Sequence, residues 1–121
     1  MKKLFKIVLV SSLALFCFSC YYNEFPEEED IIIDPEEEIS FANDILPIFA
    51  DNNCTECHNG GSVNPDLRPD NAFSSLVPNY VTAFDSASSV LYNILDEGHR
   101  NLSNDELALI EGWIDRGAED N

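Results

Sequence analysis

The strongest constraint on this chain is the five-residue run Cys54-Thr55-Glu56-Cys57-His58. It lies in the segment from Ser40 to Asn121, whose 82 residues can bury only a limited core and would gain stability from a covalent staple or a cofactor. The C-x-x-C-H spacing is the attachment signature of c-type haem, because two thiols about one helical turn apart can add to the two vinyl groups of a porphyrin. The adjacent imidazole then reaches the iron from the proximal side. We therefore expect one covalently bound haem c, held through Cys54 and Cys57, with His58 as the proximal iron ligand.

Three other interpretations of these residues stay open at this point. A redox disulfide between Cys54 and Cys57, as in thioredoxins, needs a βαβ context, whereas the flanking sequence is helical and loop-like. A zinc site made by these residues together with His99 would have to take the adjacent side chains of Cys57 and His58, which is an unusual ligand spacing. A purely structural disulfide would leave His58 without a role.

The first 19 residues have the features of a lipoprotein signal peptide. All three lysines of the chain lie within residues 1–6, and the apolar run that follows over 7–18 is too short to span a bilayer as a helix. Ser19 directly before Cys20 resembles a lipobox, the site at which bacterial lipoprotein precursors are lipidated and cut. We predict a lipid anchor on Cys20, and the alternative is an ordinary signal peptide with incidental cysteines. The expected location is the cell envelope of a Gram-negative bacterium, on the outer membrane, facing the periplasm or the surface.

Residues 20–39 are predicted to form a lipidated acidic linker. Nine of the sixteen residues from Glu24 to Ile39 are acidic, and Pro26 and Pro35 interrupt any helix there. Dense like charges repel one another, so the segment should be extended and solvated. The alternative is that the acidic run docks a basic partner or serves as a sorting signal.

The charge that remains after the signal peptide is removed excludes some functions. Residues 20–121 hold 23 acids against three arginines and no lysine, a formal charge of −20, and they contain no methionine. A polyanion of this kind binds nucleic acid and anionic lipid head groups poorly through its own surface, so no nucleic acid partner is expected. The lack of methionine excludes a redox protein that needs an axial methionine.

The segment 40–121 is predicted to be an all-α domain with long loops at 59–69 and 77–85. Its apolar residues recur at helical spacing, and no stretch alternates with period two. Gly98 and Gly117 are expected to end the third and fourth helices. The expected helices are 45–52 capped by Asp44, 71–76 capped by Asp70, 90–95 opened by Ser86 or Ser88, and a last helix opened by the capping box of Ser103 and Glu106.

Residues 41–119 resemble the small cytochrome c domains of exported bacterial proteins, including the planctomycete-type cytochrome c group. The matching pieces are ILPIF at 45–49, CTECH at 54–58, SVLYNIL at 89–95, LSNDELALI at 102–110 and WIDRGA at 113–118. The resemblance implies a class-I cytochrome c-like fold, in which N- and C-terminal helices pack around one covalently attached haem, and it implies electron transfer. The family usually places a Met-Pro pair shortly before the last helix, as the source of the distal iron ligand. This chain has Gly98-His99-Arg100-Asn101 in that place.

The distal iron ligand is predicted by elimination. The chain has two histidines, so His99, 41 residues after His58, is the strong nitrogen ligand that remains. The alternative is that His99 is a surface residue at a helix end, which would leave the iron with an open or weakly occupied site. Arg68 and Arg100 can pair with haem propionates or, equally, with surface carboxylates.

Other residues have supporting roles in this prediction. A carbonyl of Pro65 or Pro69 can accept the Nδ1 hydrogen of His58 and so orient that ring. Trp113 is expected to pack the two end helices together. Expected in the core or beside the haem are Leu67, Leu76, Leu91, Leu95 and Ile110.

The expected function is that of a membrane-anchored mono-haem c-type cytochrome. It would transfer electrons between redox partner proteins of the cell envelope that carry basic docking surfaces. The alternative is a haem-based sensor or ligand-binding domain with an open distal iron site. No further constellation of His and Arg supports a peroxidase, so we expect that the protein is not an enzyme.

Overall fold

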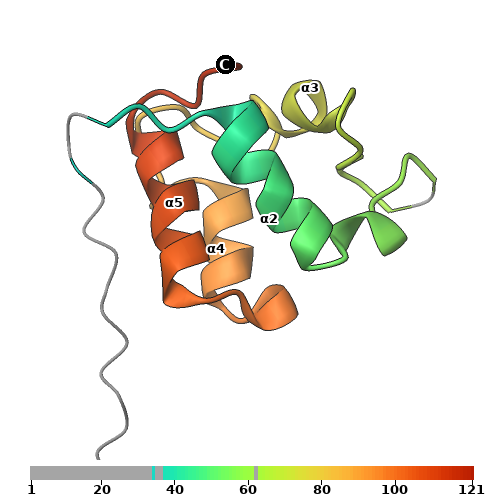
Figure 1. Cartoon of the computed structure of the whole chain (residues 1–121). Helices are drawn as coiled ribbons and strands as arrows, with labels where there is room; N and C mark the ends of the chain where they lie inside the picture. Colours follow the sequence, from blue (N-terminus) through green and yellow to red (C-terminus); the bar gives the residue numbers. More distant parts are fainter. Residues whose placement is uncertain (1–33, 35–36, 62) are drawn as a thin grey trace, which may run out of the picture.

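The computed structural model describes residues 34, 37–61 and 63–121, and the regular elements of this part are all helical (Figure 1). This confirms the all-α class for the described residues, which contain no strand. The elements are η1 (Phe41–Ile45), α2 (Leu46–Asp51), η2 (Cys54–Glu56), α3 (Ala72–Leu76), α4 (Val90–Asp96), η3 (His99–Asn101) and α5 (Asn104–Asp115). The predicted signal peptide, Cys20 and most of the predicted linker lie outside the described residues.

The first helical segment begins earlier than the sequence predicts. Ser40, not Asp44, is the capping residue, because its hydroxyl accepts a hydrogen bond from the Asn43 amide at 3.2 Å. Asp44 instead reaches back, and its carboxylate accepts from the Ser40 amide at 2.7 Å. These two hydrogen bonds of Ser40 stabilise the wide turn η1, which continues directly into α2. Pro47 stands in the first turn of α2, as predicted, where no helical amide partner is lost.

The two ends of the described chain are tied together. Asn121 accepts a hydrogen bond from the Phe41 amide through its side chain and from the Ser40 hydroxyl through its backbone carbonyl, both at 2.8 Å. The rings of Phe41 and Trp113 lie 5.1 Å apart between centroids, which confirms that Trp113 packs the N-terminal segment against α5. Figure 1 shows the C-terminal segment running beside the start of the described chain.

The folded part starts before the boundary predicted at residue 40. Ile39, assigned to the linker from the sequence, is buried in the core. The guanidinium of Arg116, just after α5, donates to the backbone carbonyls of Asp34 and Glu37 at 3.0 and 2.6 Å. The linker boundary was therefore placed too late, because one buried isoleucine among acids gives no periodic signal.

Helix α5 follows the predicted capping box. Ser103 accepts from the Glu106 amide, and the Glu106 carboxylate accepts from the Ser103 amide, so two amides that the helix leaves unpaired are satisfied. Ile110, Trp113 and Ile114 are buried on one face of α5. The helix ends where predicted, at Gly117, whose φ of 116° places it in the left-handed region.

The helices α3 and α4 form at the predicted places with different residues at their first positions. Asn71 and Ser89 stand at the N-caps, and neither side chain makes a capping bond, so the predicted caps Asp70 and Ser86 or Ser88 were wrong. The buried hydroxyl of Ser89 serves the preceding loop, where it donates to the Asp85 carbonyl at 2.9 Å and accepts from the Thr82 amide at 2.9 Å.

One continuous hydrophobic core joins these elements. Predicted members Leu67, Leu76, Leu91, Leu95 and Ile110 are all buried in it. Helices α4 and α5 lie side by side, and η1 packs on α5 (Figure 1). None of the described helices is long and apolar enough to cross a membrane.

Candidate functional site

A cavity of about 370 Å³ lies on one side of the core, in the size range of small-molecule sites. It is bounded by the motif segment 54–58, the loop 63–67, helix α4 and the turn that carries His99. Its lining is mostly apolar and includes Leu67, Leu91 and Leu95, whereas Leu76 and Ile110 belong to the core away from it. The imidazoles of His58 and His99 also line the cavity. An apolar cavity lined by two imidazoles is suited to an apolar, metal-containing ligand.

The motif forms a tight turn at the end of the first helical segment. Asn53 has a left-handed backbone (φ 54°), which reverses the chain after α2 and begins the short helix η2. The amide of His58 donates to the Cys54 carbonyl at 3.0 Å and closes this turn. Cys54 is buried at the cavity, and burial raises the pKa of its thiol. Cys57 is exposed and does not line the cavity, and the two cysteines are not joined by a disulfide.

The imidazole of His58 is oriented by a backbone carbonyl. Its Nδ1 lies 3.0 Å from the Pro65 oxygen, which confirms the predicted partner and selects Pro65 over Pro69. The Leu67 amide donates to the His58 carbonyl at 2.9 Å, so the loop segment 65–67 holds both the ring and the backbone of His58. A carbonyl at Nδ1 requires the proton there, which leaves the Nε2 lone pair available to a metal.

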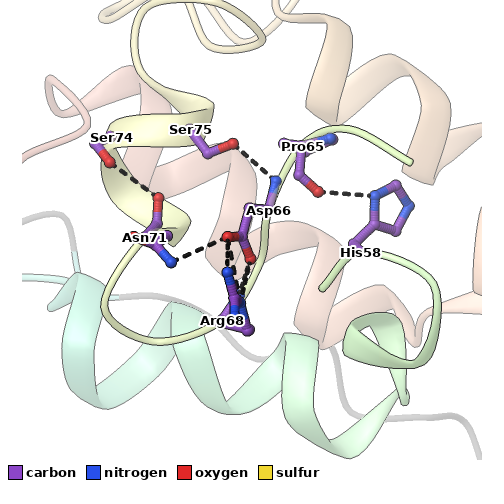
Figure 2. Close-up of polar contacts among 7 residues, drawn as sticks. All are labelled: His58, Pro65, Asp66, Arg68, Asn71, Ser74 and Ser75. Atoms are coloured by element: carbon purple, nitrogen blue, oxygen red, sulfur yellow. Dashed lines mark hydrogen bonds and ion pairs between the residues drawn. The ribbon is translucent and has the colours of Figure 1, made fainter. Parts of the chain in front are cut away.

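A polar network around Asp66, the residue after Pro65, holds this loop in place (Figure 2). The Asp66 backbone amide donates to the Ser75 hydroxyl at 2.8 Å, and the Asp66 carboxylate accepts from the Arg68 guanidinium at 2.7 Å and from the side-chain amide of Asn71 at 3.0 Å. The hydrogen bonds from Arg68 lower the pKa of Asp66 to about 2. Of the two partners expected for Arg68, the surface carboxylate is therefore the one it contacts.

His99 lies across the cavity from His58. The two ring centroids are 6.4 Å apart, and the ring planes are inclined at 80°. Imidazole nitrogens bind transition metals at about 2.0–2.1 Å, so two imidazoles on opposite sides of one metal have centroids a little over 6 Å apart. The sequence alone left open whether the loop could carry His99 over the site, and the observed separation fits one metal between the rings.

Arg100, next to His99, turns away from the cavity. Its guanidinium donates to the Asn53 carbonyl at 3.2 Å and lies 3.8 Å from the Glu56 carboxylate. Like Arg68, it pairs with a surface carboxylate. Neither arginine lines the cavity.

Several contacts of the site had no signal in the sequence. Asn71 at the N-cap of α3 and Ser75 near its end both reach the loop of Pro65, and Asn53 meets Arg100 across 47 residues. Only the close spacing of Asp66 and Arg68 could have suggested a local ion pair.

In the described part of the chain, no three or more side chains of His, Cys, Asp or Glu gather to hold a metal ion, so the four residues of the zinc alternative are not assembled as such a group.

Compared with models of protein families, with curated proteins and with solved structures, the chain has no match.

Proposed function

We propose that this chain is a membrane-anchored mono-haem c-type cytochrome, with a class-I cytochrome c-like fold, that transfers electrons in the cell envelope. The observation that carries the proposal is the pair of imidazoles, 6.4 Å apart between ring centroids, in an apolar cavity that is also lined by Cys54 of the C-x-x-C-H motif. Haem would supply an iron that cycles between the ferric and ferrous states.

Each protein group has a distinct role in this proposal. The thiols of Cys54 and Cys57 would hold the haem by adding across its two vinyl groups, each forming an S–C bond and giving its hydrogen to the neighbouring carbon, so that attachment would consume no oxidant. The Cys57 side chain is exposed outside the cavity, so it would have to turn toward the cavity to reach a vinyl group. His58 holds its Nδ1 proton on Pro65 and would offer Nε2 to the iron on one side, and His99 would be the second ligand.

The ligand set and the charge point to a low reduction potential. A methionine thioether favours ferrous iron and raises the potential, and a second imidazole does so less. The formal charge of −20 on residues 20–121 adds a field that favours the ferric state, screened by salt beyond about 8–10 Å. The same charge suits redox partners with basic docking surfaces.

The decisive experiment is expression of the full chain with a cytochrome c maturation system, followed by acid–acetone extraction and optical and EPR spectra. We expect the haem to stay with the protein and both oxidation states to be low-spin and six-coordinate. Extraction of the haem into the solvent, or one zinc per chain, would refute the proposal. Rapid binding of carbon monoxide by the ferrous wild type would favour the sensor alternative, for which the exposure of His99 is the supporting observation.

The membrane anchor is tested separately. Labelled fatty acid should enter the wild type, whereas Cys20→Ala should carry none. Fractionation should then release the Cys20→Ala protein from the envelope membranes while its haem spectrum stays unchanged. A Cys20→Ala protein that still carries the label would contradict the anchor without touching the haem assignment.

A further inference from the structure

The turn that presents His99 is held in an unfavourable backbone conformation. Gly98, Arg100 and Asn101 all have positive φ values, of 97°, 68° and 52°. Glycine adopts this region freely, but arginine does so rarely and at a cost in free energy. Such a conformation persists only where the surroundings hold it, so a contact outside the turn must favour it.

Arg100 supplies that contact. Its side chain crosses from the turn to the motif segment, where it donates to the Asn53 carbonyl and faces the carboxylate of Glu56. Asn53 and Glu56 flank Cys54, so Arg100 joins the His99 side of the cavity to the segment that holds His58. The His99 side chain itself is exposed, and its ring centroid lies 6.4 Å from that of His58 with the ring planes at 80°.

We propose that Arg100 is a positioning residue that keeps His99 opposite His58, and that release of Arg100 withdraws His99 and opens the cavity to a small neutral ligand. This inference rests on the proposed haem function. The strained backbone favours withdrawal, and the Arg100 side chain opposes it, so the turn can adopt two states. Ligands that bind only the open state then bind in proportion to its population.

The test uses the full-length, haem-loaded chain and carbon monoxide as the probe. Arg100→Ala should raise the rate of carbon monoxide binding to the ferrous protein roughly tenfold or more, the factor expected for loss of one hydrogen bond to a charged group. It should also add a high-spin fraction to the ferric EPR spectrum. Arg100→Lys, which keeps the positive charge and a donor at the end of the side chain, should restore part of the wild-type behaviour. Amide hydrogen exchange in the 98–102 turn should rise in Arg100→Ala, which gives a readout independent of the haem.

The matched control is Arg116→Ala. It removes the same unit charge from an arginine that binds the Asp34 and Glu37 carbonyls, so it should leave carbon monoxide binding unchanged. Glu56→Gln keeps the hydrogen bond from Arg100 to the Asn53 carbonyl and weakens only the ion pair, so it should raise the carbon monoxide rate less than Arg100→Ala does. Because it leaves the turn sequence unchanged, it tests the inference even if the Arg100 variants fail to fold.

The two possible failures are distinguishable. A wild type without covalent haem overturns the proposed function and this inference together. A wild type with covalent haem whose Arg100→Ala variant has the carbon monoxide rate, EPR spectrum and hydrogen exchange of the wild type overturns this inference alone.

Discussion

The His58 side and the His99 side of the cavity present the same kind of side chain on very different supports. On the His58 side, the ring is bonded to Pro65, and the loop around Pro65 is held by Ser75, Arg68 and Asn71 through Asp66. On the His99 side, the turn 98–101, in which Gly98, Arg100 and Asn101 have positive φ values, is joined to the motif by the Arg100 side chain. The difference teaches that the structure holds the two imidazoles with unequal firmness.

The two sides also differ in the free energy needed to move each imidazole away from the cavity. Displacing the His58 side requires loss of several hydrogen bonds and of the packing of Leu67, which is buried in the core. Movement of the His99 turn away from the cavity exposes little new surface of His99, because this residue is already exposed. Local opening is favoured where few buried contacts are lost, so it should start at the His99 turn.

The largest expected effect comes from removing both thiols. In Cys54→Ala with Cys57→Ala, the haem should no longer be covalently held, and the domain should lose most of its cooperative thermal transition because a small core is left with an apolar cavity. Circular dichroism melting and haem content measure this. Thr55→Ala, between the two cysteines, is the matched control and should keep both the haem and the transition. A double variant that still melts like the wild type would mean that the cavity needs no cofactor.

Much of the helical scaffold could be predicted because its signals are local. The capping box of Ser103 and Glu106 fixed the start of α5, and Gly98 and Gly117 marked helix ends. The errors at the other caps have a common cause. Ser40 and Ser89 compete with neighbouring polar residues for the cap position, and the contacts of their hydroxyls, with Asn121 for Ser40 and with Asp85 of the preceding loop for Ser89, follow no helix-capping pattern in the sequence.

Within the candidate site, the residues could be predicted more easily than their supports. The motif predicts Cys54, Cys57 and His58, and elimination predicts His99. The structure brings Cys54, His58 and His99 to one cavity and leaves Cys57 exposed outside it. The support from Ser75 and the contact between Arg100 and Asn53 depend on how loops fold back over the core. No spacing rule predicts such contacts.

The next effect tests the contrast between the two imidazoles directly. His99→Ala should open the ferrous protein to rapid carbon monoxide binding while the melting temperature changes little, because its side chain is exposed. His58→Ala should also lower the melting temperature, since it removes the bond to Pro65 and a ring that lines the cavity. Stopped-flow binding and thermal melting of both variants provide the comparison. Equal losses of stability would break the distinction drawn between the two sides.

A moderate effect is expected from a change that lies outside both sides. Ser103→Ala removes the cap of α5 and should cost about 1 kcal/mol, a fall of roughly 4–8 °C in melting temperature for a domain of this size. Carbon monoxide binding should stay that of the wild type, because the helix body and the His99 turn are held by different contacts. A faster rate in Ser103→Ala would show that the His99 turn and α5 open as one unit.

The smallest effect is the acid dependence of the His58 side. The pKa of Asp66 is lowered to about 2, chiefly by its hydrogen bonds from Arg68, against an ordinary value of about 3.9. A carboxyl whose pKa is depressed by folding stabilises the protein above its ordinary pKa, and that contribution is lost as the pH falls from about 4 toward 2.

Melting curves of the wild type, Asp66→Asn and Arg68→Gln between pH 5 and pH 2.5 test this dependence. Both substitutions should flatten the loss of stability over that range, since one removes the carboxyl and the other removes the donor that lowers its pKa. At neutral pH the cost of either should be small, because Arg68 is half exposed and exposed ion pairs contribute little. If the three proteins lose stability in parallel, Asp66 is not what holds the Pro65 loop in acid. The greater firmness of the His58 side would then have to come from the buried packing of Leu67 and the Ser75 hydroxyl.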